Sequence, residues 1–361
     1  MSKISSTAIY YCILLAFQFG LHPKLAKVFQ NECVNKSSIV ILTEFTKILI
    51  ALITLPFESK VERSNIINSW SIKNSLTIAA LPAILYAIQN LTTQYAYPLT
   101  DPMTFNLLNQ TKTLAAAFWL YIIMGKKQSY IQVFALILLL VAAIILTSKT
   151  DIIDLLSSKT VTMYFQKDLL NGGFTWEIIN IFKKSIDMKT LGSNGLGIML
   201  VLTASMISGI STALTEKTLQ LSGNGPKRNS IFLSAEMAVY AIVFLLISDN
   251  LNSNKETNEK CKIHDNFFAY WDIYTFIPVL SNAFGGLIVG LVTKHAGGIL
   301  KGFALIAGLI LTAFVSWIVD MKKLRSNDWV AMIIVALSIY LHSNHSQIRD
   351  MFVTKKKEKT T

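Results

Sequence analysis

Long stretches of apolar side chains recur along the chain and are separated by short polar connections. A helix that crosses the hydrocarbon layer of a membrane needs about 17 to 25 mainly apolar residues. Ten stretches fit this pattern: 5–22, 38–56, 76–97, 103–124, 130–148, 194–220, 230–248, 270–293, 299–319 and 327–343. The pattern predicts an all-α integral membrane protein with ten transmembrane helices.

One long polar stretch divides these spans into two groups of five. Residues 149–193 mix both signs of charge with Gly172, Gly173 and many Ser and Thr side chains, which is typical of a hydrophilic loop. We therefore expect a first five-helix repeat at 1–148, the loop at 149–193, a second repeat at 194–343 and a basic tail at 344–361. Because five is odd, the second repeat enters from the opposite face, which predicts a 5+5 inverted repeat.

Composition agrees with a membrane protein. Hydrophobic residues make up 52% of the chain and charged residues 15%, whereas soluble domains carry roughly 25% charged residues. The net charge of +12 lies in the connections and the tail, without interleaved aromatic residues, so it predicts a lipid bilayer and not nucleic acid as the partner. The lysine and arginine distribution favours both termini in the cytosol. No cleavage site follows the first span, so we expect it to be retained.

The three cysteines do not form a recognisable framework. Cys12, Cys33 and Cys261 lack metal-ligand spacing. Cys33 and Cys261 could pair in an oxidising lumen, but two free thiols is the favoured interpretation. Asn35 is the sequon residue expected to face the lumen, and its glycosylation stays open.

Two lysines stand alone inside apolar spans. Lys112 lies in the fourth span, and Lys301 lies in GGILKGFALIAGLILTAFV, the fourth span of the second half. Lysine at the centre of a membrane helix costs about 2.5 to 3.5 kcal/mol, so each marks a functional-site hypothesis. Because the two spans are equivalent in an inverted repeat, both ammonium groups could converge on one anion near the midplane.

Aromatic and amide side chains share helical faces near these lysines. Phe105, Asn109 and Lys112 follow at spacings of four and three, and Tyr86 and Asn90 are four apart. Amides and rings suit the base or sugar of a ligand, and lysine suits phosphate. Hydrogen bonding between helices explains an intramembrane asparagine equally well.

Two further patterns have both a structural and a functional interpretation. Glu44 and Lys47 are three apart on one face, so they form either a structural ion pair or a gating pair beside a cavity. Glycines in GxxxG-like spacing predict close helix packing around an opening onto a cavity. These glycines are Gly285, Gly286, Gly290, Gly298 and Gly302.

Other chemistry lacks a motif. There is no glycine-rich phosphate loop, no ATPase signature and no nucleophile beside a base, so neither an enzyme nor an ATP-driven pump is expected. No cofactor is expected either. His342 and His345 lack a third ligand, so no metal is predicted. Transport would then depend on a gradient or an exchange.

Several motifs resemble those of nucleotide-sugar transporters, most of all the Golgi branch that carries CMP-sialic acid, UDP-galactose and UDP-N-acetylglucosamine. The motifs are TEFTK, LPAILYAIQN leading to NQTK, the pair Glu216–Lys217 followed by KRN, and NAFGGL leading to ILKGF. Their order and spacing extend from the first span to the last.

The resemblance implies a ten-helix drug/metabolite transporter fold. It implies import of a nucleotide sugar, with a UDP-sugar favoured, into the Golgi or endoplasmic reticulum lumen in exchange for nucleoside monophosphate. Glu44 and Lys47 would lie beside the binding site. The implied binding positions are Tyr86, Asn90, Phe105, Asn109, Lys112, Asn229 and Lys301.

This chain departs from the family pattern at several of those positions. Phe105 and Asn109 replace a tyrosine-containing face, apolar Leu233 and Val289 stand at commonly polar positions, and Gly297–Gly298 replaces an Asp–Asn pair. The final residues KEKTT resemble a cytosolic retrieval signal. Alternatives are a carrier of another organic anion or metabolite, and a non-transporting scaffold for a glycosyltransferase. A homodimer also stays open.

Overall fold

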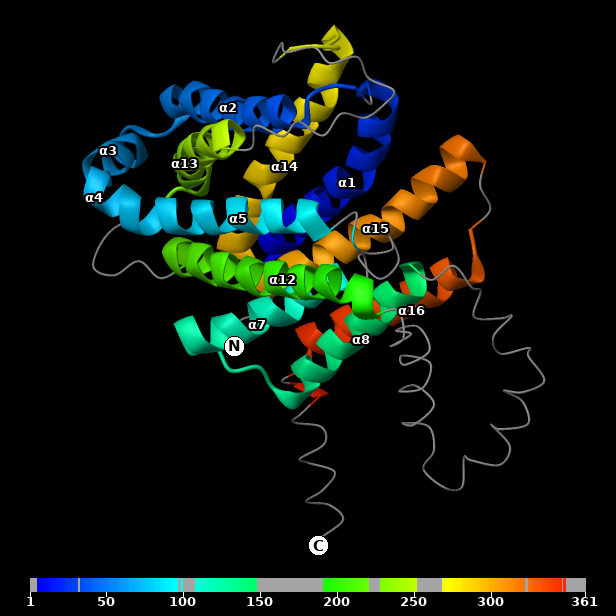
Figure 1. Ribbon diagram of the computed structural model, residues 1–361. Helices are drawn as coiled ribbons and strands as arrows, with labels where there is room; N and C mark the ends of the chain where they lie inside the picture. The colour runs from blue at the N-terminus through cyan, green and yellow to red at the C-terminus, as the bar shows by residue number, and fades with distance from the viewer. Residues whose placement is uncertain are drawn as a thin grey trace, which may run out of the picture.

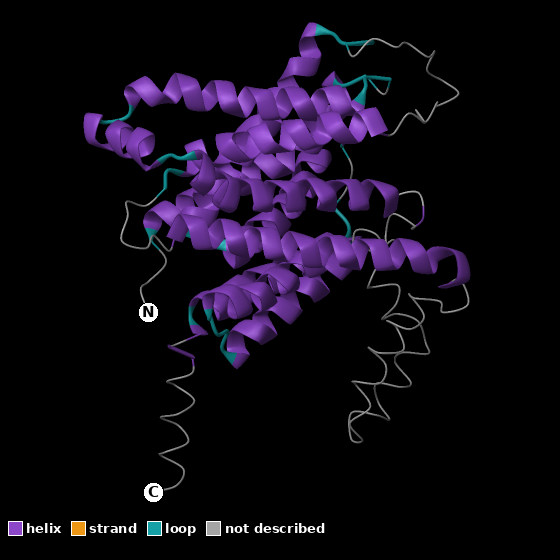
Figure 2. Ribbon diagram, turned by 60° about the vertical axis from the view of Figure 1, so that its left-hand side comes forward, coloured by secondary structure: helices purple, strands orange, loops and turns teal. Residues whose placement is uncertain are grey.

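The computed structural model describes residues 5–31, 33–96, 99, 108–147, 191–220, 228–251, 268–321, 324–345 and 347–348, and these residues contain helices and no strand (Figure 2). The long helices of the first half are α1 (Ser6–Phe29), α2 (Lys36–Thr54), α5 (Leu81–Ala96), α7 (Thr111–Met124) and α8 (Tyr130–Thr147). Those of the second half are α12 (Leu191–Gln220), α13 (Ser230–Leu251), α14 (Phe276–His295), α15 (Gly298–Asp320) and α16 (Ser326–Ser343). Short helices are η1 (Leu55–Phe57), α3 (Lys60–Ser69), α4 (Ile72–Ser75), η2 (Leu76–Ala80) and η5 (Ile273–Thr275).

Length and apolar composition indicate a multi-pass membrane protein. Within the described residues, six helical segments are long and apolar enough to cross a membrane: Ser37–Phe57, Ile72–Thr93, Gly195–Gln220, Ser230–Ser248, Ile273–His295 and Gly298–Val319. Two shorter apolar helices cover Thr111–Met124 and Tyr130–Ile145. The expected total of ten spans therefore stays a prediction.

The helix boundaries differ from the expected spans at several places. The expected span ends at residue 22, whereas α1 continues through Pro23 to Phe29 and packs against α14 and α15. α3 was not expected, and Ser59 begins it by accepting a hydrogen bond from the Glu62 N–H at 3.2 Å. α12 begins at Leu191, inside the expected loop.

The helices pack across the two halves of the chain (Figure 1). α12 lies against α5 and α7, and α1 lies against α14 and α15. α2 contacts α13 and α14, while α8 and α16 form a separate pair. Small residues permit two of these close approaches: a Cβ added to Gly20 would lie 2.8 Å from the Gly308 carbonyl oxygen, and one added to Gly209 would lie 2.8 Å from that of Ala115. The expectation of close helix packing therefore extends beyond the glycines chosen from sequence.

One expectation about the cysteines was wrong. Cys33, in the connection between α1 and α2, is disulfide-bonded and not a free thiol, whereas Cys12 is free. Cys261 lies outside the described residues. Beside Cys33, the Asn35 side chain begins α2 by accepting a hydrogen bond from the Ser37 N–H at 2.9 Å.

Candidate functional site

A cavity of about 180 Å³ lies where α5, α7, α12, α14 and α15 meet. It is smaller than the roughly 300–1,000 Å³ typical of pockets that enclose drug-sized ligands. In this conformation of the protein, the cavity can therefore enclose only part of a drug-sized ligand. The lining residues are Tyr86, Gln89, Lys112, Thr113, Ala116, Ser208, Thr212, Val289, Gly298, Lys301, Gly302 and Leu305.

Lys301 is held in place by a side chain of α12. Its Nζ atom donates a hydrogen bond to Thr212 Oγ1 at 3.0 Å. The Tyr86 hydroxyl lies 3.0 Å from the same oxygen, and Lys301 Nζ is 5.9 Å from the centre of the Tyr86 ring. That distance is within the reach of a cation–π interaction. Three helices therefore contribute to the position of one ammonium group.

Lys112 faces the same cavity from the first turn of α7. Because Lys112 and Lys301 line the same cavity, their like charges repel each other. Within the described part of the chain, neither lysine forms an ion pair with a carboxylate. Two like charges without counter-charge are unfavourable where they are half-buried, because each loses part of its solvation without compensation. The cavity is therefore complementary to an anion.

Sequence reasoning missed most of the other polar groups in this cavity. Gln89, Thr113, Ser208 and Thr212 line it with amide and hydroxyl groups. A signal was present, because Ser208, Thr212 and Glu216 follow at intervals of four and share one face of α12. Isolated hydroxyls are ordinary in membrane helices, so only the packing of α12 distinguishes this face.

Several residues selected from sequence lie away from the cavity. Asn90 is exposed, and its neighbour Gln89 lines the cavity in its place. Asn109 is half-buried and is not among the lining residues. Asn229 stands at the start of α13, where it donates to Glu58 Oε1 at 3.1 Å and accepts from the Ile231 N–H at 3.0 Å. Phe105 lies outside the described residues.

Glu44 and Lys47 form an ion pair and do not line the cavity. Lys47 Nζ lies 2.6 Å from Glu44 Oε1, and both side chains are 16% exposed. A Cβ added to Gly286 on α14 would lie 2.6 Å from Lys47 Cε. The pair therefore fills the contact between α2 and α14.

The other selected glycines also lie where helices approach closely. Gly298 and Gly302 line the cavity, and a Cβ at Gly302 would lie 2.6 Å from Thr113 Oγ1. A Cβ at Gly290 would lie 2.8 Å from Ser234 Oγ, and one at Gly285 would overlap the side chain of Gln18. α15 thus approaches α7 through a glycine beside Lys301.

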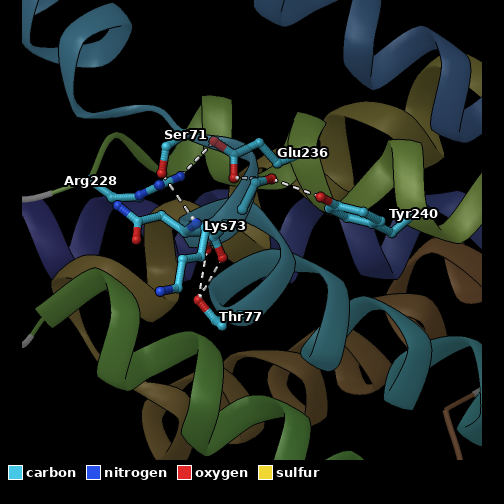
Figure 3. Close-up of polar contacts among 8 residues, drawn as sticks. Ser71, Lys73, Thr77, Arg228, Glu236 and Tyr240 are labelled. Atoms are coloured by element: carbon cyan, nitrogen blue, oxygen red, sulfur yellow. Dashed lines mark hydrogen bonds and ion pairs between the residues drawn. The ribbon is translucent and has the colours of Figure 1, made fainter.

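A second polar cluster lies outside the cavity and joins α4 to α13 (Figure 3). Arg228 Nη1 lies 2.5 Å from Glu236 Oε1, and both side chains are 14% exposed. Ser75 donates to Glu236 Oε2 at 3.2 Å and accepts from the Tyr240 hydroxyl at 3.1 Å. The charges in this cluster are compensated, in contrast to those of the cavity.

Comparison with known proteins identifies the family. The family model described as nucleotide-sugar transporter matches residues 2–343. The chain belongs to the nucleotide-sugar transporter family. It is 32% identical over 358 residues to the UDP-N-acetylglucosamine transporter ROCK1 of Arabidopsis thaliana, covering 99% of this chain and 97% of the relative. It is 26% identical over 313 residues to the UDP-N-acetylglucosamine transporter of Mus musculus, covering 85% and 84%.

The fold of this nucleotide-sugar transporter is also found in a solved crystal structure. The two share a TM-score of 0.60 at 9% identity, over 93% of this chain and 97% of the other. The family model and the named relatives confirm the expected family membership and nucleotide-sugar transport. The exchange partner, the compartment and the roles of individual residues stay predictions. His342 and His345 belong to no metal-binding group of three or more side chains within the described ranges.

Proposed function

We propose that this chain is an antiporter, and not an enzyme, that exchanges a UDP-sugar for UMP across a Golgi or endoplasmic reticulum membrane. UDP-N-acetylglucosamine is the first substrate to test, because two similar relatives are named for its transport. Lys112 and Lys301 bind the phosphates, and Tyr86, Gln89 and Ser208 orient the base and sugar. The transport cycle uses no cofactor.

The observation that carries this proposal is the pair of uncompensated lysines in one cavity. Both ammonium groups line it, and neither has a described carboxylate partner. Phosphate groups supply the missing negative charge, and charge-assisted hydrogen bonds to phosphate are among the strong ones. Since nucleoside monophosphate and nucleotide sugar both carry phosphate, one site can alternate between them.

We further propose ten spans in a 5+5 inverted repeat, and the packing supports this. In such a repeat the helices α1, α2, α5, α7 and α8 correspond in order to α12, α13, α14, α15 and α16. The contact of α1 with α15 then corresponds to that of α12 with α7, and the contact of α1 with α14 corresponds to that of α12 with α5. The contact of α2 with α14 becomes that of α13 with α5, and the pairs α2–α13 and α8–α16 are unchanged. The close approaches at Gly20 and Gly209 occupy equivalent helix pairs.

In this arrangement both termini lie in the cytosol, in agreement with the basic tail. The connection between α7 and α8, with Lys126 and Lys127, and the one between α14 and α15 then lie on the cytosolic side. Alternating access proceeds by movement of the two repeats around the lysine site.

Reconstitution of the purified chain tests the proposed exchange. Liposomes preloaded with UMP, CMP, GMP or buffer are given labelled UDP-N-acetylglucosamine, UDP-galactose, CMP-sialic acid or GDP-mannose. We expect uptake of a UDP-sugar that internal UMP stimulates by at least about tenfold over buffer, because exchange supplies the return step that net import lacks.

Other outcomes would replace the proposal. Stimulation by CMP or GMP in place of UMP would reassign the base. Uptake that no internal nucleotide stimulates would contradict antiport. Folded protein without uptake of any nucleotide sugar would favour another anion carrier or the scaffold.

A further inference from the structure

Glu216 is a buried carboxylate that the proposed binding site does not include. Its side chain is 2% exposed, and it does not line the cavity. It follows Thr212 by one turn on the same face of α12. Burial of a carboxylate is costly unless hydrogen bonds and a positive charge compensate it, so its contacts indicate what it does.

The two carboxylate oxygens of Glu216 bind different helices. Oε2 accepts a hydrogen bond from the Gly298 N–H at 2.5 Å. Oε1 lies 2.5 Å from Lys126 Nζ, in the connection between α7 and α8. Gln220, one turn further along α12, accepts from Lys126 at 2.6 Å and donates to the Thr293 carbonyl at 2.9 Å. One turn of α12 thus ties the start of α15 to the end of α7.

Glycines make this contact with α15 possible. Gly297 has φ of 88°, which favours glycine, and a Cβ there would lie 3.1 Å from Glu216 Oε1. A Cβ at Gly298 would overlap the Thr212 methyl group. A larger side chain at either position would separate α12 from the first turn of α15.

The contact lies at the helix end that carries a phosphate-binding lysine. Gly298 is the first residue of α15, and Lys301 follows three residues later within the same turn. The first N–H groups of a helix lack partners within it, and a carboxylate there interacts favourably with the helix dipole. Because Glu216 already accepts the hydrogen bond of the Gly298 N–H, this N–H is not available to an anion in the cavity, whereas the Lys301 side chain lines the cavity.

We propose that Glu216 is a positioning residue for Lys301, and that it acts through the N-terminus of α15. α12 then fixes this lysine twice: Glu216 holds the backbone of its turn, and Thr212 holds its ammonium group. The contact of Glu216 with Lys126 compensates the buried charge but does not position Lys301. The expected effect of Glu216 on transport rests on the proposed function. The expected effect of Glu216 on the N-terminus of α15 does not.

Three variants of the full chain separate these contacts. Glu216→Ala removes both contacts of the carboxylate, whereas Lys126→Ala removes the ion pair and the hydrogen bond to Gln220 but keeps the contact of Glu216 with Gly298. Lys127→Ala is the matched control, because this neighbouring lysine is exposed. Hydrogen exchange of purified protein measures the amides at the start of α15, and liposomes loaded with UMP give KM and Vmax for UDP-N-acetylglucosamine.

We expect Glu216→Ala to speed exchange of the first α15 amides and to raise KM, each by about tenfold or more, because a charge-assisted hydrogen bond is lost. Lys127→Ala keeps both quantities within about twofold of wild type, because this lysine is exposed. Lys126→Ala leaves Glu216 buried without its counter-charge and lowers stability, but we expect it to keep KM within about twofold of wild type because the hydrogen bond to Gly298 remains. Unchanged exchange of these amides in Glu216→Ala would overturn the inference, even if no variant and no wild-type protein transports.

The kinetic result can also overturn it. A Glu216→Ala protein with lower Vmax and unchanged KM would show a general structural role. A Lys126→Ala protein with the same rise in KM would show that the ion pair, and not α15, is decisive. Wild-type protein that lacks UMP-stimulated uptake would contradict the proposed function alone, because the amide exchange still tests the positioning.

Discussion

The basic residues inside the cavity differ from those packed outside it. Lys47, Lys126 and Arg228 each lie 2.5 to 2.6 Å from a carboxylate oxygen. Lys112 and Lys301 share a cavity and have no such partner within the described residues. The two groups of basic side chains therefore differ in whether a carboxylate compensates their charge.

The two arrangements have different energetic consequences. The two charges of a buried ion pair compensate each other. Removing one partner leaves the other charge uncompensated, so the substitution reduces stability. A lysine that awaits an anionic ligand is uncompensated until the ligand arrives, so its loss reduces binding and not folding. Substitutions in the two regions should separate these effects.

The largest expected effect is loss of transport in the variant that carries both Lys112→Ala and Lys301→Ala. In the proposed site each lysine contributes a charge-assisted bond to phosphate, so we expect kcat/KM for UDP-sugar exchange to fall by about 1,000-fold, and by about 30-fold in each single variant. Liposome uptake measures this fall. Lys217→Ala, at an exposed lysine of α12, is the control. Transport near the wild-type rate in either single variant would refute the role of that lysine.

The opposite behaviour is expected for Glu236→Ala. This substitution leaves Arg228 largely buried without its partner and breaks the contact with Ser75. We expect a loss of about 2–3 kcal/mol in stability, less than for a fully buried pair because both side chains are 14% exposed. Thermal unfolding in detergent measures it, and KM should stay within about twofold of wild type. A tenfold rise in KM with unchanged stability would place this cluster in the binding site.

The smallest expected effect combines a small loss of stability with a small rise in KM. Gly302→Ala places a methyl group against Thr113, in the contact between α15 and α7 beside Lys301. We expect a loss of about 1–2 kcal/mol from overpacking, together with a rise in KM of about threefold. The unfolding midpoint and uptake kinetics report the two quantities. If neither changes, α15 and α7 do not approach as closely as the structure indicates.

Hydropathy predicted much of the fold, because each membrane helix must be apolar over a length that the bilayer sets. It could not predict α3, whose polar residues lack an apolar face of the required length. The predicted span at 5–22 is also shorter than α1, which continues to Phe29 and packs against α14 and α15, because hydropathy reports the apolar length and not the full helix. The unexpected disulfide at Cys33 depends on a contact that sequence spacing does not show.

The candidate site was predicted less completely than the fold. Burial cost identified Lys112 and Lys301, because lysine is rare and costly in this environment. Asn90 and Asn229 were chosen for residue type and family position, but the face of a helix that meets the cavity depends on its neighbours. Thr212 and Glu216 were missed as partners of α15 for the same reason.

Direct binding tests the central claim that the two lysines recognise phosphate. UMP and uridine differ only in the phosphate group, so calorimetry of both ligands with purified wild-type protein isolates its contribution. We expect UMP to bind about 30-fold or more tightly than uridine, and this preference to fall to about threefold or less in the variant with Lys112→Ala and Lys301→Ala, while the affinity for uridine stays the same. If folded protein of this double variant still prefers UMP by the wild-type factor, the lysines do not bind the phosphate and the account is wrong.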